Sequence, residues 1–321
     1  MFPITRMRRA RVNQSIRELL SDVSVDARKL IMPVFVDEGL NGKREINSMP
    51  GIFRHGIDAL PGHLDELQHA GLKNIILFGI PKEKDSGGSS SYLSDGIVQK
   101  SIRIARENFS LNVIADLCLC EYTDTGQCGI IRDGYVDNDA TLSVYDKIAA
   151  SYADAGVDVV APSGMMDGQV GSIRRALDKS GHENVMIMSY SNKYASTLYS
   201  PFRDAADSAP RVGDRKSYQM DYRRKKEYLM ETSLDIEEGA DIIMVKPAIF
   251  YLDIVKSVSD HFPKPLAVYS VSGEYSMIRH ALDLGILPHE TVGEYITSIF
   301  RAGADLVITY FALEIAGKGG A

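Results

Sequence analysis

Short apolar runs recur along the chain, separated by longer stretches in which apolar and polar residues alternate with helical spacing. The runs are rich in β-branched residues and nearly free of polar ones, as in "NIILFGI" at 74–80. Strands of this kind are buried on both faces, as in parallel sheets that helices cover. There are eight of these runs, at 29–36, 74–80, 111–119, 157–163, 184–191, 240–247, 265–272 and 304–311.

The stretches between the runs predict helices, for example at 137–155, 168–180, 223–238, 251–262, 274–284 and 289–302. Three helices end in a Gly-x-Asp triplet that starts the next strand, at 156–158, 239–241 and 303–305. Glycine there suits the left-handed conformation that closes a helix. Repeated strand–helix units predict a (β/α)8 (TIM) barrel over residues 27–321. An open doubly wound sheet is the alternative, but its usual Gly-rich turn is absent after the first strand, at 35–43.

Composition and charge restrict the partners. The chain has 321 residues, 45% of them hydrophobic, and a net charge of −7. An acidic protein lacks the basic face that nucleic acid requires, so we expect no nucleic-acid partner. No apolar run approaches the roughly 20 residues that span a bilayer, and the N-terminus lacks the apolar core of a secretory signal. The three cysteines form one cluster, which favours the reducing cytoplasm over a disulfide scaffold.

Residues 1–26 differ from the rest of the chain. The first twenty contain a single acid, Glu18, against five arginines: Arg6, Arg8, Arg9, Arg11 and Arg17. A mitochondrial transit peptide has a similar composition. A strand follows almost at once, however, and leaves little length for a cleavage region. We therefore favour an extended N-terminal arm that packs on another subunit.

Catalytic residues of a (β/α)8 barrel lie at the carboxyl ends of its strands. The third predicted strand ends in Asp116, Cys118 and Cys120, which we expect on one face of an extended chain, and Cys128 follows after a loop. Three thiolates suit zinc, and an open fourth position is typical of catalytic zinc. A closed structural site with Glu121 or Asp124 as fourth ligand, or three ordinary buried cysteines, are the alternatives.

Two lysines end neighbouring strands, Lys193 just after the fifth run and Lys246 near the end of the sixth. Burial and a second cation both favour a neutral amine, which can attack a carbonyl and form a Schiff base. A lysine at such a position can instead reach solvent or bind an anion. Hydroxyl groups end three further strands: Ser163, Ser272 and Tyr310.

The connection at 194–222 is long and shows no sustained period, which is typical of a functional lid or a disordered loop. It carries four cations, Arg203, Arg211, Arg215 and Lys216. Guanidinium groups bind carboxylates in bidentate fashion, so we predict a lid over an acidic small substrate. A solvated basic loop is the plainer interpretation.

Several motifs resemble those of the porphobilinogen synthase (δ-aminolevulinic acid dehydratase) family over essentially the whole chain. They are "MSYSNKYAS", "YSPFRDA", "GDRKSYQM", "GADIIMVKPAIFYLDIV" and "VSGEY". The family pattern around its Schiff-base lysine, G-x-D, three apolar residues and K-P-x-x-x-Y, is matched from Gly239 to Tyr251. The resemblance implies a lyase of tetrapyrrole (heme) biosynthesis that condenses two 5-aminolevulinate molecules into porphobilinogen.

The resemblance also implies roles for single residues. Lys246 would hold one substrate as an imine, and Lys193 would hold or activate the other. Asp116 and Ser163 would lie near the amine of the second substrate, where protons move. Ser272 and Tyr310 would bind the carboxylate of the first substrate. Arg203, Arg215 and Gln219 would bind the carboxylate of the second. Phe202 and Tyr199 would line the pocket. The cysteines would match the zinc-type subgroup, and the arm a homo-octamer.

The chain departs from the zinc-type pattern at two places. Relatives often read S-H-G-H-C where this chain has "DTGQC" at 124–128, and Gln127 and Ser217 stand where some members bind a second zinc. A second zinc is therefore not expected. Glu231 falls where certain bacterial members carry a carboxylate for an allosteric magnesium, although a lone glutamate on a charged helix is usually only solvated.

Two other classes compete with this interpretation. A class I aldolase on the same barrel would also use Lys246 as an imine lysine, but has no use for three thiolates. A non-catalytic metal-storage or regulatory barrel would use the cysteines without any amine chemistry. Zinc content, a colour test for porphobilinogen and covalent trapping on Lys246 discriminate among the three.

Overall fold

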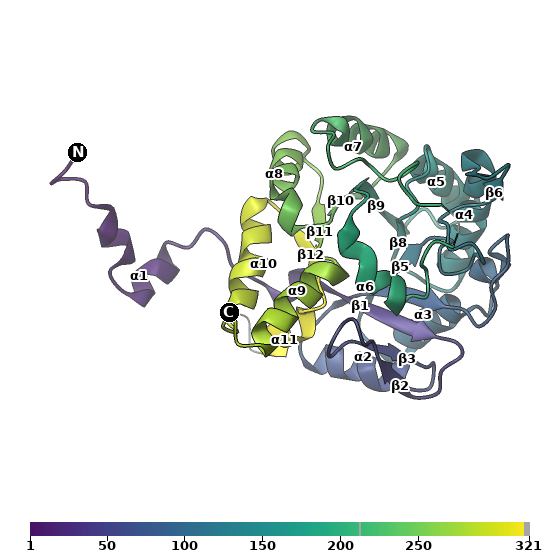
Figure 1. The fold of residues 1–321 in the computed structure, drawn as a ribbon, viewed down its shortest axis with the longest axis horizontal. Helices are drawn as coiled ribbons and strands as arrows, with labels where there is room; N and C mark the ends of the chain where they lie inside the picture. Colours follow the sequence, from purple (N-terminus) through teal and green to yellow (C-terminus); the bar gives the residue numbers. More distant parts are fainter. Residues whose placement is uncertain (212, 318–321) are drawn as a thin grey trace.

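Eight parallel strands close into a barrel in the computed structural model, which describes residues 1–211 and 213–317 (Figure 1). The strands pair in chain order, and the last pairs with the first to complete the ring. They are β1 (Leu30–Asp37), β4 (Asn74–Ile80), β5 (Asn112–Leu117), β8 (Val159–Pro162), β9 (Met186–Lys193), β10 (Ile242–Lys246), β11 (Leu266–Tyr269) and β12 (Leu306–Ile308). The predicted (β/α)8 barrel is confirmed, with one strand in each apolar run.

Helices lie between the strands and cover the outside of the barrel (Figure 1). All six predicted helices are present, with ends within a few residues of the expected bounds: α4 (Asn138–Asp154), α5 (Gln169–Lys179), α7 (Glu227–Glu238), α8 (Leu252–His261), α9 (Ser272–Asp283) and α10 (Thr291–Ala302). The others of the barrel wall are α2 (Leu60–His69), α3 (Ile97–Asn108) and α11 (Ala312–Gly317). Every residue of β1 is buried, because helices cover one face and the barrel interior the other. Within the described parts of the chain, no helix combines the length and apolar character needed to cross a membrane.

The repeated Gly-x-Asp triplets hold adjacent strands together at their amino ends. In each triplet the aspartate accepts the backbone N–H near the start of the preceding strand, at 2.8, 2.8 and 2.9 Å: Asp158 from Val113, Asp241 from Ile187 and Asp305 from Leu266. Gly239 and Gly303 end α7 and α10 in the left-handed region, with φ of 106° and 117°. The sequence repeat therefore corresponds to one structural clamp used three times.

The smaller elements lie outside the barrel ring. A hairpin of β2 (Lys43–Glu45) and β3 (Phe53–His55) follows β1, and β6 (Ile131–Arg132) pairs with β7 (Tyr135–Val136). The N-terminal segment projects away from the barrel in Figure 1 and carries a 3₁₀ turn, Met7–Arg11, and α1 (Gln14–Leu19). Neither of these two elements buries a residue within this chain.

The long connection after β9 is not as irregular as predicted. It contains a 3₁₀ turn at Thr197–Tyr199 and the helix α6 (Ser200–Ala205). A helix of six residues is too short to produce a sustained period in the sequence. Residue 212 of this connection lies outside the described residues.

Candidate active site

Two buried lysines lie side by side at the carboxyl ends of neighbouring strands. Lys193 is the last residue of β9 and Lys246 the last of β10, and the two are partners in the strand register. Each of the two lysines is only 5% exposed. The apolar strands that precede them bury both amines, so the solvent-reaching alternative does not hold for either lysine.

Aromatic rings surround the amine of Lys246. Its Nζ lies 4.0 Å from the ring centre of Tyr269 and 5.1 Å from that of Tyr190. The rings of Tyr199 and Phe202 each lie 5.3 Å away. Burial in this apolar surrounding, and next the positive charge of Lys193, lower the pKa of Lys246 from 10.5 to about 7. A substantial fraction of the amine is therefore neutral, and nucleophilic, at neutral pH.

Lys193 and Asp116 share a hydrogen-bonded group with Ser163. The Lys193 amine donates to the backbone carbonyl of Ser163, and the Ser163 hydroxyl donates to Asp116 at 3.0 Å. Burial raises the pKa of Asp116, while the charges of both lysines oppose the increase. Asp116 is thus a carboxyl group with a raised pKa beside two amines, which suits a proton carrier.

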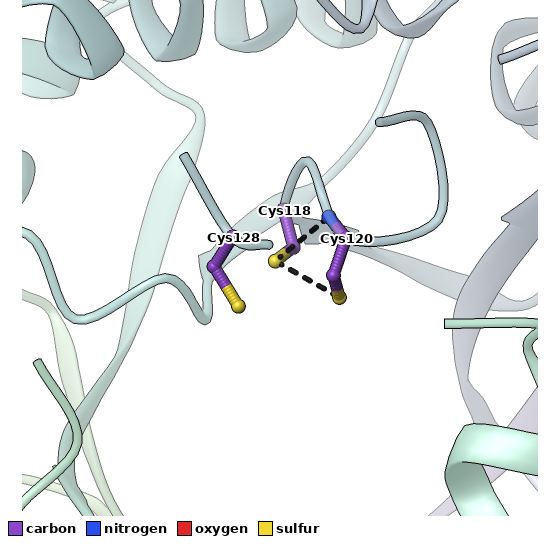
Figure 2. A group of neighbouring side chains, drawn as sticks. All are labelled: Cys118, Cys120 and Cys128. Atoms are coloured by element: carbon purple, nitrogen blue, oxygen red, sulfur yellow. Dashed lines mark hydrogen bonds between the residues drawn. The ribbon is translucent and has the colours of Figure 1, made fainter. Parts of the chain in front are cut away.

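Three cysteine side chains converge close to the lysines. The sulfurs of Cys118, Cys120 and Cys128 all lie within 4.8 Å of one another, and each residue is at most 3% exposed. Figure 2 shows the three sulfurs gathered from two segments of the chain, with Cys118 and Cys120 sulfurs 3.3 Å apart. The predicted strand position is wrong, because β5 ends at Leu117. The two cysteines converge through the turn that follows the strand, not through strand alternation.

The donor set fits a thiophilic metal ion. The three sulfurs form a group that could hold a metal, and no carboxylate of the described residues belongs to it. Asp124 is exposed, whereas Glu121 is buried and its carboxylate lies 3.2 Å from the Cys120 sulfur. Burial raises the pKa of Cys118, and hydrogen bonds from the other two thiols lower that of Cys128. Three soft ligands leave one tetrahedral position for water or substrate, which favours the catalytic over the structural arrangement.

The four cations of the 194–222 connection divide into two pairs. Arg211 and Lys216 are exposed, while Arg203 is half-buried and Arg215 is 5% exposed. Arg215 donates to the backbone carbonyls of Gly126, at 2.9 Å, and Ser208, so it ties this connection to the cysteine loop. Burial and the charge of Arg215 lower the pKa of Arg203. The inner pair thus faces the site, and the outer pair faces solvent.

Unsatisfied donors mark the inner side of this connection. The Nε atoms of Arg203 and Arg215 and the amide nitrogen of Gln219 are buried and find no hydrogen-bond partner in 1–211 or 213–317. A buried N–H without an acceptor costs about 1–3 kcal/mol. Three such donors on one connection provide the chemistry to bind an anionic ligand.

The remaining predicted residues lie around Lys246. Ser272 is the first residue of α9, and its hydroxyl accepts the N–H of Phe202 at 2.9 Å. The Tyr310 and Tyr269 hydroxyls lie 3.1 Å apart. The Tyr199 hydroxyl has two backbone carbonyls as acceptors, and one of them, that of Lys246, lies 3.3 Å away. Tyr199 and Phe202 thus lie beside the amine, whereas Ser272 and Tyr310 contact residues that surround it, Phe202 and Tyr269.

Glu231 lies on α7, outside the strands of the barrel. It lines a surface cavity of about 470 Å³ together with Asp167, Glu227 and Arg224, and Gln219 of the 194–222 connection lines the same cavity. Burial is the main cause that raises the pKa of Glu231 to about 7. The negative charge of Asp235, and then of other nearby acids, adds to the increase. The glutamate is thus part of an acidic cluster and is not simply solvated.

Three buried residues at the site are absent from the sequence prediction: Tyr190, Tyr269 and Glu274. The two tyrosines stand inside apolar strands, where an aromatic residue normally indicates core packing. Glu274 is completely buried without a cationic partner among the ion pairs of the described residues. Its signal in the sequence is its place directly after Ser272 and Gly273, at the end of the seventh strand.

Amines, thiols and hydroxyls at the carboxyl ends of the strands define a (β/α)8-barrel enzyme. The sequence model of the family described as "Delta-aminolevulinic acid dehydratase" matches residues 4–318. The chain belongs to the delta-aminolevulinic acid dehydratase family.

Individual relatives cover nearly the whole chain. The delta-aminolevulinic acid dehydratase of Methanothermus sociabilis is 53% identical over 98% of each chain, and that of Bacillus subtilis is 48% identical over 97% of each. A crystal structure of the Toxoplasma gondii ME49 enzyme, in complex with the reaction product porphobilinogen, superposes with a TM-score of 0.95 and 38% identity. That match covers 98% of this chain and 92% of the other. The predicted family resemblance is confirmed.

Proposed function

We propose that this chain is a porphobilinogen synthase, a hydro-lyase that condenses two 5-aminolevulinate molecules into porphobilinogen with loss of two waters, in tetrapyrrole (heme) biosynthesis. Family membership supports the activity, and the Toxoplasma gondii relative is described in complex with that product. The observation that carries the proposal is the pair of buried amines, Lys193 and Lys246, in register on adjacent strands. Condensing two keto acids requires that the carbonyl group of each molecule be activated, and each amine can activate one.

Lys246 is the nucleophile toward the first substrate. Its neutral amine attacks the keto carbon, and loss of water gives an imine. The protonated imine withdraws electrons and makes the adjacent C–H acidic, which permits a new carbon–carbon bond. The hydroxyls of Ser272 and Tyr310 bind the carboxylate of this substrate beside the amine.

Lys193 holds or activates the second substrate. Arg203, Arg215 and Gln219 supply donors for its carboxylate, and their unsatisfied N–H groups support this role. Tyr199 and Phe202 line the pocket beside the Lys246 amine. The connection at 194–222 acts as the lid.

Proton transfer is assigned to Asp116 with Ser163. The 3.0 Å hydrogen bond between them and the raised pKa of Asp116 support a group that accepts and returns a proton near both amines. Asp116 lies on β5, which pairs with β8, and Ser163, whose carbonyl accepts from Lys193, directly follows β8.

Cys118, Cys120 and Cys128 would hold one zinc ion. Bound there, zinc supplies Lewis acidity toward a carbonyl or hydroxyl oxygen of the substrate. The three buried sulfurs within 4.8 Å support this assignment. Glu231 and the acids around it would hold an allosteric magnesium ion on the outside of the barrel.

The exposed N-terminal segment supports an oligomer, for which we propose a homo-octamer. It leaves Phe2, Ile4, Met7 and Leu19 at least 66% exposed in the single chain. Apolar side chains at such exposure are expected to be covered by another subunit. Residues 1–26 then form the subunit-contact arm and residues 27–321 the catalytic domain, in a cytoplasmic enzyme.

The direct test is incubation of the metal-loaded oligomer with 5-aminolevulinate, with and without a chelator, following pyrrole colour. We expect porphobilinogen to form only without the chelator. Lys246→Ala should abolish product while zinc content stays unchanged. Aldol products without pyrrole would support the class I aldolase, and no covalent mass on Lys246 after borohydride reduction would contradict imine chemistry altogether.

A further inference from the structure

Glu274 is a buried carboxylate that the proposed chemistry does not yet use. It lies in the first turn of α9 and is 0% exposed. Its partners include three backbone N–H groups: Ala248 at 3.1 Å and Ile249 on Oε1, and Val271 at 2.5 Å on Oε2. Burying a charge without a cation is expensive, so a carboxylate held in this way needs an explanation.

The three donors come from two different loops of the site. Ala248 and Ile249 follow Lys246 by two and three residues, at the end of β10. Val271 directly precedes Ser272, at the end of β11. One carboxylate therefore joins the loop after the imine lysine to the turn that carries the carboxylate-binding serine, with one oxygen for each loop.

Neighbouring groups hold this connection rigidly. The Tyr295 hydroxyl, on α10, lies 2.9 Å from the Ser270 hydroxyl and also hydrogen-bonds Glu274. A Cβ atom on Gly273 would lie 2.5 Å from the Leu198 carbonyl oxygen, so the turn packs directly on the backbone of the lid. The distance between Lys246 and Ser272 is thus fixed from several sides.

Helix capping alone does not account for these contacts. A glutamate at the third position of a helix commonly accepts the N–H of the residue before the helix, as Glu274 does with Val271. That role uses one oxygen and leaves the other free for solvent. Here the second oxygen is buried and binds two N–H groups of another strand end.

We infer that Glu274 is a positioning residue, which sets the distance between the Lys246 amine and the Ser272 hydroxyl to the length of a keto acid. The inference rests on the proposed function of these two residues. A substrate that is bound at both ends requires its two partners in register, and a displacement of about 1 Å can cost about 100-fold in rate. A ligand bound at one end only does not require this register.

The experiment compares two ketones of equal length on the metal-loaded oligomer. Levulinate carries both the keto group and the carboxylate, and 2-pentanone replaces the carboxylate with a methyl group. The rate of borohydride trapping on Lys246 is measured by mass spectrometry for each, and their ratio reports register. We expect Glu274→Gln, whose single oxygen serves one loop only, to lower the levulinate-to-pentanone ratio about 10- to 100-fold.

Two further variants separate positioning from charge and from stability. Glu274→Asp keeps the charge but is too short to reach both loops, and should lower the ratio similarly. Asp241→Asn removes a carboxylate clamp at the opposite end of β10, and should leave the ratio unchanged even where the melting temperature falls. A Glu274→Gln or Glu274→Asp protein that retains the wild-type ratio would overturn the inference.

The Ser272→Ala background tests the mechanism directly. If Glu274 acts through Ser272, adding Glu274→Gln to Ser272→Ala lowers the ratio no further, whereas independent effects would multiply. Trapping on the wild-type protein separates a failure of the proposed imine chemistry from a failure of the role of Glu274. Absence of any trapped adduct on wild-type Lys246 would refute the imine chemistry itself, and normal trapping with a multiplicative double variant would refute only the role of Glu274.

Discussion

Replacing Lys246 with methionine should stabilise the protein while it abolishes catalysis. The folded state lowers the pKa of this lysine from 10.5 to about 7, chiefly by burial, so the charged form is disfavoured on folding. Methionine has a similar length and no charge, and the rings of Tyr190, Tyr199, Phe202 and Tyr269 form an apolar surrounding for it. A catalytic amine is thus expected to reduce stability.

The magnitude follows from proton linkage. Between the two pKa values the unfolded state binds more protons than the folded state, so wild-type stability rises as pH increases from about 7 to 10.5. The advantage of Lys246→Met is then about 5 kcal/mol at most at pH 6 and shrinks by about 3 kcal/mol by pH 9. Attraction between the ammonium and the four rings reduces the advantage of Lys246→Met expected at pH 6.

The assay is denaturant unfolding from pH 6 to pH 9 at fixed protein concentration and metal loading. Lys225→Met removes an exposed lysine and corrects for loss of a surface charge. The pH dependence of the difference is the decisive quantity, because it does not depend on how well methionine packs. An advantage of Lys246→Met that is constant over this range would refute a neutral, buried amine.

Three further predictions concern the ligands. Removing zinc should stop pyrrole formation but leave levulinate trapping on Lys246 largely intact, as mass spectrometry of the chelated protein would show; equal loss of both would contradict separate roles. Cys128→Ser should reduce bound zinc below one ion per chain by elemental analysis, with little change in far-UV circular dichroism. Arg203→Gln should raise the KM for 5-aminolevulinate about 10- to 100-fold, for loss of a charged hydrogen bond, at unchanged zinc content; steady-state kinetics at fixed zinc would check it, and an unchanged KM would exclude Arg203 from the carboxylate clamp.

The barrel and the place of the site follow from local signals in the sequence. Apolar runs such as 74–80 and 240–247 define fully buried strands, and buried parallel strands leave few possible architectures. Once the strands are known, their carboxyl ends are known, and Lys193 and Lys246 fall there without any information on contacts. The register between β9 and β10 then makes the two lysines neighbours.

Other features depend on contacts that a sequence pattern does not contain. Glu274 binds residues about 25 positions away, at Ala248 and Ile249, and nothing in "VSGEY" indicates its partners. Tyr269 occupies an apolar strand and becomes distinctive only when the Lys246 amine is found 4.0 Å from its ring. The spacing of Cys118 and Cys120 predicts that strand alternation places them on one face, whereas a turn after Leu117 brings them together.

Under the proposed function, the burial that lowers the pKa of Lys246 also accounts for the cationic side chains of the 194–222 connection. A substrate carboxylate that approached the amine without compensation would stabilise the ammonium form and raise its pKa, removing the nucleophile. The positive charges of Arg203 and Arg215 can neutralise the carboxylate of the second substrate and so weaken its effect on Lys246. Arg203 and Arg215 thus preserve the reactivity of the lysine as well as bind the substrate.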